Sequence, residues 1–149
     1  MRRPFEDYLV DDELLQFVEK WEGFRAKAYK CPAGIWTIGY GHTADVEEGD
    51  GPVTQHEAEE MLRADLENFK DRLAWRIKTP VSKPQFIAIM SLVYNVGVRY
   101  LTTRCPKLMG AIERGDFEAA AHEFLDITSG GVPGLVRRRQ AESSLMRLW

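Results

Sequence analysis

Residues 22–43 read EGFRAKAYKCPAGIWTIGYGHT, and this stretch decides the fold. It starts at Glu22, where a helical pattern ends, and it continues as a strand candidate over residues 25–29. A turn at Cys31-Pro32-Ala33-Gly34 leads into a second β-favouring run over residues 35–42. Glycines at the bends therefore predict a small hairpin or sheet directly after a helix.

A helix precedes this stretch. Asp11 or Asp12 can cap it, and its apolar residues recur at helical spacing. Gly23 fits the position just past its end. The apolar positions are Leu14, Leu15, Phe17, Val18 and Trp21.

From residue 54 onward the chain is predicted to be helical. Thr54 with Glu57 and Ser82 with Gln85 are capping boxes. Pro106 suits the first turn of a third helix, and Asp116 can cap a fourth. A Gly/Pro-rich break over residues 129–134 precedes a last helix that runs to Trp149. The apolar face of the first of these helices is Leu62, Leu66, Phe69, Leu73 and Ile77.

These elements predict an α+β fold within a single domain, residues 1–149. A small sheet-containing N-terminal lobe (about residues 12–53) is expected to pack on a larger helical lobe (about residues 54–149). A cleft is expected between the two.

The composition of the chain argues against several classes of function. The 149 residues have a formal net charge of −3, which argues against a nucleic-acid binder. No apolar segment follows the basic N-terminus, and the longest uncharged stretch, residues 84–98, is too short to span a bilayer. Two cysteines make no disulfide scaffold and no metal cluster, so neither a metal nor a cofactor is predicted. The C-terminal arginines fit a solvated helix face or an anionic envelope.

Glu22 is the first candidate for chemistry. A carboxyl group beside apolar surface stays protonated near neutral pH, which a general acid requires. Glu22 follows Trp21 at the end of an amphipathic helix and immediately precedes the predicted sheet. A solvated residue at a helix end is the alternative interpretation.

Three separated motifs resemble the phage lysozyme family, the endolysin muramidases of glycoside hydrolase family 24. The family pattern of Glu, eight residues, Asp or Cys, five residues and Thr, followed by Ile-Gly-x-Gly-His, falls on Glu22, Cys31, Thr37 and residues 38–42. Residues 85–97 and 133–142 resemble two later family motifs, and the likeness covers roughly residues 14–147.

The resemblance implies a lysozyme-like fold and hydrolysis of the β-1,4 bond between N-acetylmuramic acid and N-acetylglucosamine. Glu22 would be the general acid, Thr37 would hold the attacking water, and Cys31 would assist on the opposite face of the sugar. The partner would be a peptidoglycan glycan strand, and the enzyme a monomer without cofactor or metal. Such endolysins are made in the host cytoplasm and reach the periplasm after a holin opens the inner membrane.

Cys31 stands where many members of the family have Asp. An unperturbed thiol, with a pKa of about 8.5, is mostly neutral at pH 7, whereas a carboxylate is ionised. A thiolate could act as a base or as a nucleophile. The hypothesis is that Cys31 positions the water together with Thr37, which gives inversion. A small buried residue in a turn and a disulfide with Cys105 are the alternatives.

Several further residues carry expectations of their own. Tyr40 and Asn95 are candidate substrate-binding residues, although Tyr40 could pack in the core, as could Trp36, and Asn95 could cap a helix. His42 is expected to support the sheet rather than to act as a base. Either Arg137 or Arg138 is expected to approach Glu22 from the last helix.

Two other functions remain open. A lytic transglycosylase cuts the same bond with one Glu and no activated water, because the sugar's own 6-hydroxyl closes an anhydro ring. A wall-binding protein could keep the fold without catalysis. Thr37 at the family spacing argues against the first, and the presence of Glu22 argues against the second.

Overall fold

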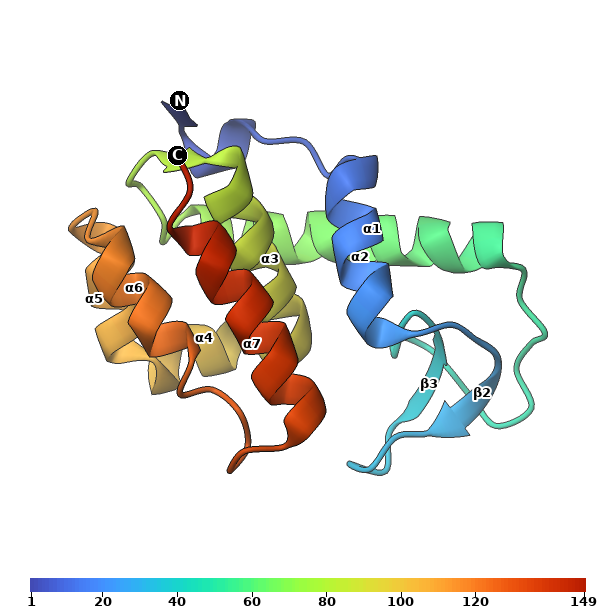
Figure 1. The fold of residues 1–149 in the computed structure, drawn as a ribbon. Coiled ribbons are helices and arrows are strands. Elements are labelled where there is room, and N and C mark those ends of the chain that lie inside the picture. The colour runs from blue at the N-terminus through green and yellow to red at the C-terminus, as the bar shows by residue number, and fades with distance from the viewer. The chain divides into compact units, whose positions relative to one another are not determined.

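The computed structural model describes all residues, 1–149, and mixes helices with two small antiparallel sheets (Figure 1). This is the predicted α+β class. The elements in chain order are β1 (Arg2–Arg3), the 3-10 turn η1 (Phe5–Asp7), α1 (Asp12–Glu22), β2 (Arg25–Lys30), β3 (Trp36–Gly39), α2 (Gln55–Ala74), β4 (Val81–Ser82), α3 (Lys83–Val96), α4 (Val98–Arg104), α5 (Pro106–Glu113), α6 (Phe117–Phe124) and α7 (Pro133–Met146).

The chain forms two compact units. We call Val10–Asn68 the hairpin unit and the remainder, Met1–Leu9 with Phe69–Trp149, the helical unit. The boundary between the units falls inside α2, whereas the sequence predicted a boundary at about residues 53 and 54. The reason is that the first part of α2 packs with the hairpin: a Cβ atom on Gly39 would lie 3.1 Å from the Cβ of Ala58.

Helix α1 begins and ends as its sequence predicts. The side chain of Asp11 accepts a hydrogen bond from the amide of Leu14 at 3.1 Å, so Asp11 rather than Asp12 is the N-cap. Gly23 ends the helix with a φ of +71°, a conformation that favours glycine. The buried face of α1 is Leu14, Leu15 and Val18.

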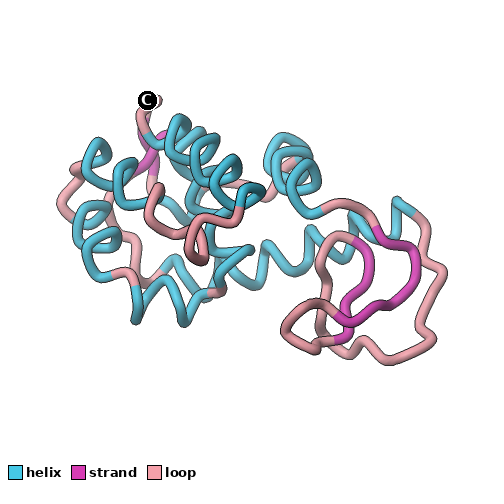
Figure 2. Tube along the Cα trace, turned by 60° about the horizontal axis from the view of Figure 1, so that its bottom comes forward, coloured by secondary structure: helices cyan, strands magenta, loops and turns pink.

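Strands β2 and β3 form the predicted hairpin, drawn in magenta in Figure 2. The loop that follows runs back along β2, because the amide of Ala28 donates to the carbonyl of Asp50 and that of Val53 donates to Ala26. Gly51 allows this close approach: a Cβ there would lie 2.5 Å from the carbonyl oxygen of Ala26. The loop therefore fixes the outer edge of the hairpin.

Helix α3 is the centre of the helical unit, and every residue from 85 to 93 is buried. The predicted capping box is formed: the Ser82 hydroxyl accepts from the Gln85 amide, and the Gln85 side chain accepts from the Ser82 amide. Helix α7 packs on α3 and on α6. This stretch of α3 has no exposed face, and its residues are accordingly apolar on every side except for the hydrogen-bonded Gln85 and Ser91.

The N-terminal residues belong to the helical unit, although the sequence predicted no element before residue 11. Strand β1 pairs antiparallel with β4, and the rings of Phe5 and Tyr8 pack on Phe86 at 5.0 and 4.9 Å between centroids. The Arg2 guanidinium lies 4.6 Å from the ring centroids of both Phe117 and Trp149. These contacts join the two ends of the chain.

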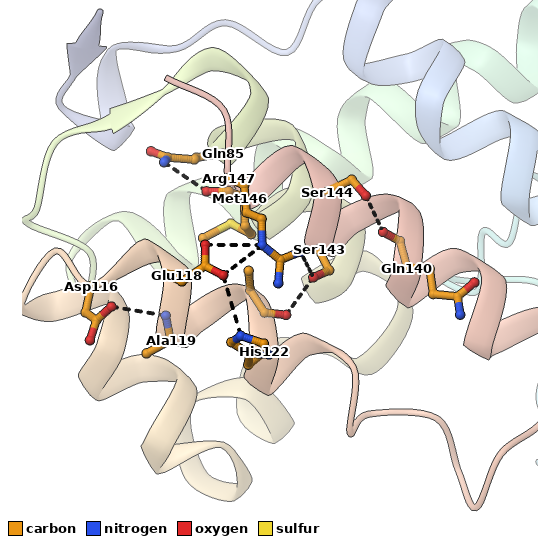
Figure 3. A network of polar contacts seen from close by, with 11 residues as sticks. Gln85, Asp116, Glu118, Ala119, His122, Gln140, Ser143, Ser144, Met146 and Arg147 are labelled. Carbon is orange, nitrogen blue, oxygen red and sulfur yellow. Dashed lines mark hydrogen bonds and ion pairs between the residues drawn. The ribbon is translucent and has the colours of Figure 1, made fainter.

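Polar contacts tie α6 to α7 (Figure 3). The Arg147 guanidinium lies 3.1 Å from a Glu118 carboxylate oxygen, and the Ser143 hydroxyl donates to the Ala121 carbonyl at 2.7 Å. The N-cap of α6 is Asp116, as predicted.

A buried ionic cluster joins α7 to α3. Glu142 and Arg139 have fully buried side chains, and Nε of Arg139 lies 2.7 Å from a carboxylate oxygen of Glu142. Nε of Arg138 lies 3.4 Å from the same carboxylate group, and the Ser91 hydroxyl donates to it. Two guanidinium groups therefore share one carboxylate.

Two helix predictions need correction. Helix α4 was not predicted, because Gly97, with a φ of +90°, separates it from α3 and its seven residues are too few for a clear period. The last helix ends at Met146 rather than at Trp149.

No single helix in the structure has the length and apolar character to cross a membrane. Helices α3 and α4 taken together are long and apolar enough, but they meet at a bend of 100°.

Candidate active site

Glu22 is the last residue of α1 and is half-buried. The helix stops there because Gly23 turns the chain, and β2 begins two residues later at Arg25. The sequence therefore places one carboxyl group at the junction between the helix and the hairpin.

Cys31 and Thr37 are brought together by the turn of that hairpin. The amide of Cys31 donates to the carbonyl oxygen of Ile35 at 3.0 Å, and the amide of Gly34 donates to the carbonyl of Cys31 at 2.8 Å. Thr37 lies opposite Tyr29 in the β2–β3 ladder. Because side chains alternate along a strand and opposite residues share a face, Tyr29, Cys31 and Thr37 lie on one face of the hairpin.

The environment of Cys31 favours the thiolate. A backbone hydrogen bond from Ile35 is the largest cause that lowers the pKa of the Cys31 thiol, and the Ala33 backbone and the Thr37 hydroxyl act in the same direction. Thr37 is only 4% exposed, and its hydroxyl can also donate to the Ile35 carbonyl at 2.9 Å. The pair thus offers a polarisable sulfur and a fixed hydroxyl to a water molecule.

His42 connects the hairpin to α2. Its Nδ1 lies 2.7 Å from Oδ2 of Asp65, and its backbone exchanges two hydrogen bonds of 2.9 Å with Ile38, the neighbour of Thr37. With one ring nitrogen held by Asp65, the side chain fixes the end of β3 on the helix. These contacts favour support over catalysis.

Tyr40 lies in the core. Its side chain is 4% exposed, its ring centroid is 5.6 Å from that of Phe24, and its hydroxyl accepts a hydrogen bond from Gln55 at 2.9 Å. A sugar ring cannot stack on a face that is covered in this way. The core interpretation of Tyr40 therefore replaces the substrate-binding one.

Asn95 lies in the helical unit, near the end of α3, and its side chain is exposed. Gly97, not Asn95, ends α3 and precedes α4, so the capping alternative does not fit. Asn95 instead lines a pocket of about 450 Å³ with Tyr100, Asp126 and Thr128. A role in substrate binding stays a prediction.

The remaining expectations concern cysteines and arginines. Cys31 and Cys105 are both free thiols, so the alternative of a disulfide between them is not realised. The guanidinium of Arg138 contacts Ser91 and Glu142 within the helical unit, while Arg137 is exposed. That either arginine approaches Glu22 stays a prediction.

One neighbour of Thr37, Tyr29, and the arginine that contacts it, Arg25, were missed as candidate site residues. Tyr29 is the cross-strand partner of Thr37, and the Arg25 guanidinium lies 4.2 Å from the Tyr29 ring centroid. The alternation of residues along β2 was a usable signal for Tyr29, but the register that pairs residue 29 with residue 37 depends on the length of the turn.

The chain and its fold match known proteins. A family model described as phage lysozyme matches residues 19–142. The endolysin of Acyrthosiphon pisum secondary endosymbiont phage 1 is 39% identical over 143 residues, which are 91% of this chain and 96% of that protein.

Two solved structures resemble the fold closely. The muramidase domain of SpmX from Asticaccaulis excentricus gives a TM-score of 0.85 at 28% identity and covers 95% of this chain and 99% of its own. The endolysin from Escherichia coli O157:H7 phage FAHEc1 gives a TM-score of 0.82 at 27% identity and covers 95% of both chains. The chain therefore belongs to the phage lysozyme family, and its function is that of an endolysin, an enzyme that cleaves bacterial peptidoglycan.

Proposed function

We propose that the enzyme is an N-acetylmuramidase that hydrolyses the β-1,4 bond between N-acetylmuramic acid and N-acetylglucosamine, with Glu22 as general acid. The observation that supports this most is local. A carboxyl group ends α1, and the hairpin that begins three residues later carries a thiol and a hydroxyl on one face. Glycoside hydrolysis needs an acid for the leaving oxygen and a separate group for the water.

The proposed reaction is a single displacement. Glu22 gives its proton to the glycosidic oxygen, and the bond from that oxygen to the anomeric carbon breaks. A water molecule held by Thr37 and Cys31 attacks the anomeric carbon from the opposite face, and its proton passes to the Cys31 thiolate. The new hydroxyl lies on the face opposite the departed oxygen, so the product is the α-anomer. Proton exchange with solvent restores Glu22 and Cys31.

The first test replaces the acid. Glu22→Gln keeps the shape of the side chain but removes the proton, and general acid catalysis contributes about 10²–10⁴-fold. We expect a loss of that size in the rate at which permeabilised Gram-negative cells lose turbidity. Glu19→Gln is the matched control, because Glu19 is a partly buried carboxyl group one turn earlier on the same helix. Equal rates for wild type and Glu22→Gln would contradict the proposal.

The same enzyme can be tested against the two alternatives. Digestion in ¹⁸O-labelled water, followed by mass spectrometry, should give reducing ends that carry one ¹⁸O atom. A product lighter by one water, without label, would identify a lytic transglycosylase. Binding to cell walls with no turbidity loss would identify a non-catalytic wall-binding protein.

The domain organisation, the oligomeric state and the place of action of the enzyme are proposed from its resemblance to the family. We propose that residues 1–149 act as one catalytic domain and as a monomer, and that Asn95 contributes to substrate binding. Synthesis in the host cytoplasm and holin-dependent access to the periplasm are proposed on the same ground. Relatives named SAR-endolysins, such as that of Bacteriophage PS119 at 33% identity, make the route of release a separate question to test.

A further inference from the structure

We propose that the cations of β2, Arg25, Lys27 and Lys30, bind the carboxylates of the stem peptides that peptidoglycan carries, and that Arg25 is the principal contact. We call these three residues the β2 cations. The inference rests on the proposed function, because it names the part of the substrate that the hairpin unit recognises besides the sugars.

The charge of the hairpin unit makes the β2 cations unusual. Val10–Asn68 contains fourteen acidic and five basic side chains, a formal charge of −9. Three of the five basic residues lie within the six residues of β2, and all three are exposed. An acidic unit repels an anionic polymer, and β2 is the one strand that offsets this repulsion next to Cys31 and Thr37.

The β2 cations have no carboxylate partner within the protein. Arg63, the other arginine of the unit, forms an ion pair with Asp12 at 3.0 Å. Arg25 and Lys30 instead lie over aromatic rings, at 4.2 Å from the centroid of Tyr29 and 5.5 Å from that of Trp36. Their charges are therefore positioned but not neutralised.

The stacking of Arg25 sets the direction of its hydrogen bonds. A guanidinium group that lies over an aromatic ring uses its face for that contact. Its N–H donors lie in the guanidinium plane and remain available for a planar carboxylate, which an arginine binds with two parallel hydrogen bonds. Its contact with Tyr29 thus preorganises the Arg25 guanidinium to bind a carboxylate.

The register places this site beside the reacting groups. Tyr29 lies opposite Thr37, whereas Arg25 pairs with Gly39 beyond an irregularity in the ladder. The contact of the Arg25 guanidinium with the Tyr29 ring brings its charge toward the face of the hairpin that carries Thr37 and Cys31. A glycan of N-acetylated sugars has no charge apart from its lactyl groups, and those are amides wherever a stem peptide is attached. The free carboxylates of an intact strand near a bound muramic acid are those of its stem peptide.

The experiment compares wild type with Arg25→Gln, Arg25→Lys and Arg72→Gln. Arg72 is the matched control, since it is an exposed arginine that lies 5.6 Å from the ring centroid of Phe69 and has no carboxylate partner. The substrates are isolated glycan strands with stem peptides, the same strands after a carbodiimide and ammonia have converted their carboxylates to amides, and neutral chito-oligosaccharides. The readouts are kcat and KM from the release of reducing ends.

On strands with stem peptides, Arg25→Gln should raise KM about 10-fold with kcat within twofold, and Arg25→Lys should raise it less. Arg72→Gln should leave both parameters within twofold. The effect of Arg25→Gln should disappear on amidated strands and on chito-oligosaccharides, because neither has a free carboxylate. An unchanged KM on intact strands, or an equal rise on amidated strands or neutral oligosaccharides, would overturn the proposal.

Co-sedimentation with intact cell walls separates this proposal from the proposed function. In a Glu22→Gln background cleavage is expected to be too slow to degrade the walls during sedimentation, so weaker sedimentation of the Arg25→Gln double variant supports the carboxylate site whichever bond the enzyme cleaves. Vesicles of phosphatidylglycerol form a second arm. If Arg25→Gln weakens binding to the vesicles but not to the walls, the β2 cations serve a membrane surface and the proposal is wrong.

Discussion

Cys31 and Thr37 share one acceptor, the carbonyl oxygen of Ile35. The Cys31 amide donates to it at 3.0 Å, and the Thr37 hydroxyl donates to it at 2.9 Å. One backbone atom therefore holds the end of β2 and the hydroxyl of β3 in register. The thiol and the hydroxyl that we assign to the water are fixed by the turn itself.

The Thr37 hydroxyl should be needed for the rate. Thr37→Val keeps the shape of the buried side chain but removes the donor, and a misplaced reacting group costs about 10²-fold. We expect kcat/KM on isolated glycan strands to fall by about that factor, while Thr37→Ser retains activity within tenfold. Equal activities for the Val and Ser variants would show that the hydroxyl has no part in the reaction.

Cys31 should set the lower pH limit of activity. A base must be ionised, so kcat/KM rises with pH as the thiol of the free enzyme ionises. Because the pKa of Cys31 is lowered, that rise should lie below the ordinary thiol value of about 8.5. Cys31→Asp should move it toward the carboxylate range, to lower pH, and Cys31→Ala should be impaired at every pH. Full activity of Cys31→Ala would contradict this role.

The two thiols should differ in reactivity. Cys31 is half-buried with a lowered pKa, whereas burial, with a smaller contribution from Glu123, raises the pKa of Cys105, which is 8% exposed. The thiolate is the reactive form. At pH 7, iodoacetamide should modify Cys31 at least about tenfold faster than Cys105, as measured by peptide mass spectrometry, with activity lost in parallel. Modification of Cys105 first would be the opposite result.

The site residues that lie close together in the sequence could be predicted from it. Glu22, Cys31 and Thr37 lie within sixteen residues of sequence, and helix-end and turn signals place them. Tyr40 could not be assigned from sequence, because the same ring suits a core or a sugar. Only the packing of Phe24 and the hydrogen bond from Gln55 decide between them.

The parts of the fold that a single local sequence signal determines, such as helix ends, could be predicted. The capping boxes at Thr54 and Ser82 and the glycine after Glu22 mark helix ends by the hydrogen bonds they form. The pairing of β1 with β4 joins residues about eighty positions apart, and two-residue strands have no period to detect. The boundary inside α2 was missed because a continuous helix gives no sign of which unit each turn packs against.

The buried cluster of α7 should matter for stability. Removing one partner of a buried ion pair costs about 3–5 kcal/mol, and Glu142→Gln would leave two buried guanidinium groups without their carboxylate. At about 2–4 °C per kcal/mol, the melting temperature should fall by about 10 °C. Glu118→Gln, which removes the exposed partner of Arg147, should cost at most about 1 kcal/mol. Similar shifts for both variants would contradict the difference in burial.

The anomer of the first product tests the proposed roles of Glu22, Cys31 and Thr37 together. Proton NMR during the first minutes of digestion, before mutarotation, reports the configuration at the new reducing end of N-acetylmuramic acid. Direct attack by a water held at Cys31 and Thr37 predicts that the α-anomer forms first. The β-anomer formed first would show that the bond is cleaved with retention, and would contradict the assignment of Cys31 and Thr37 to the water.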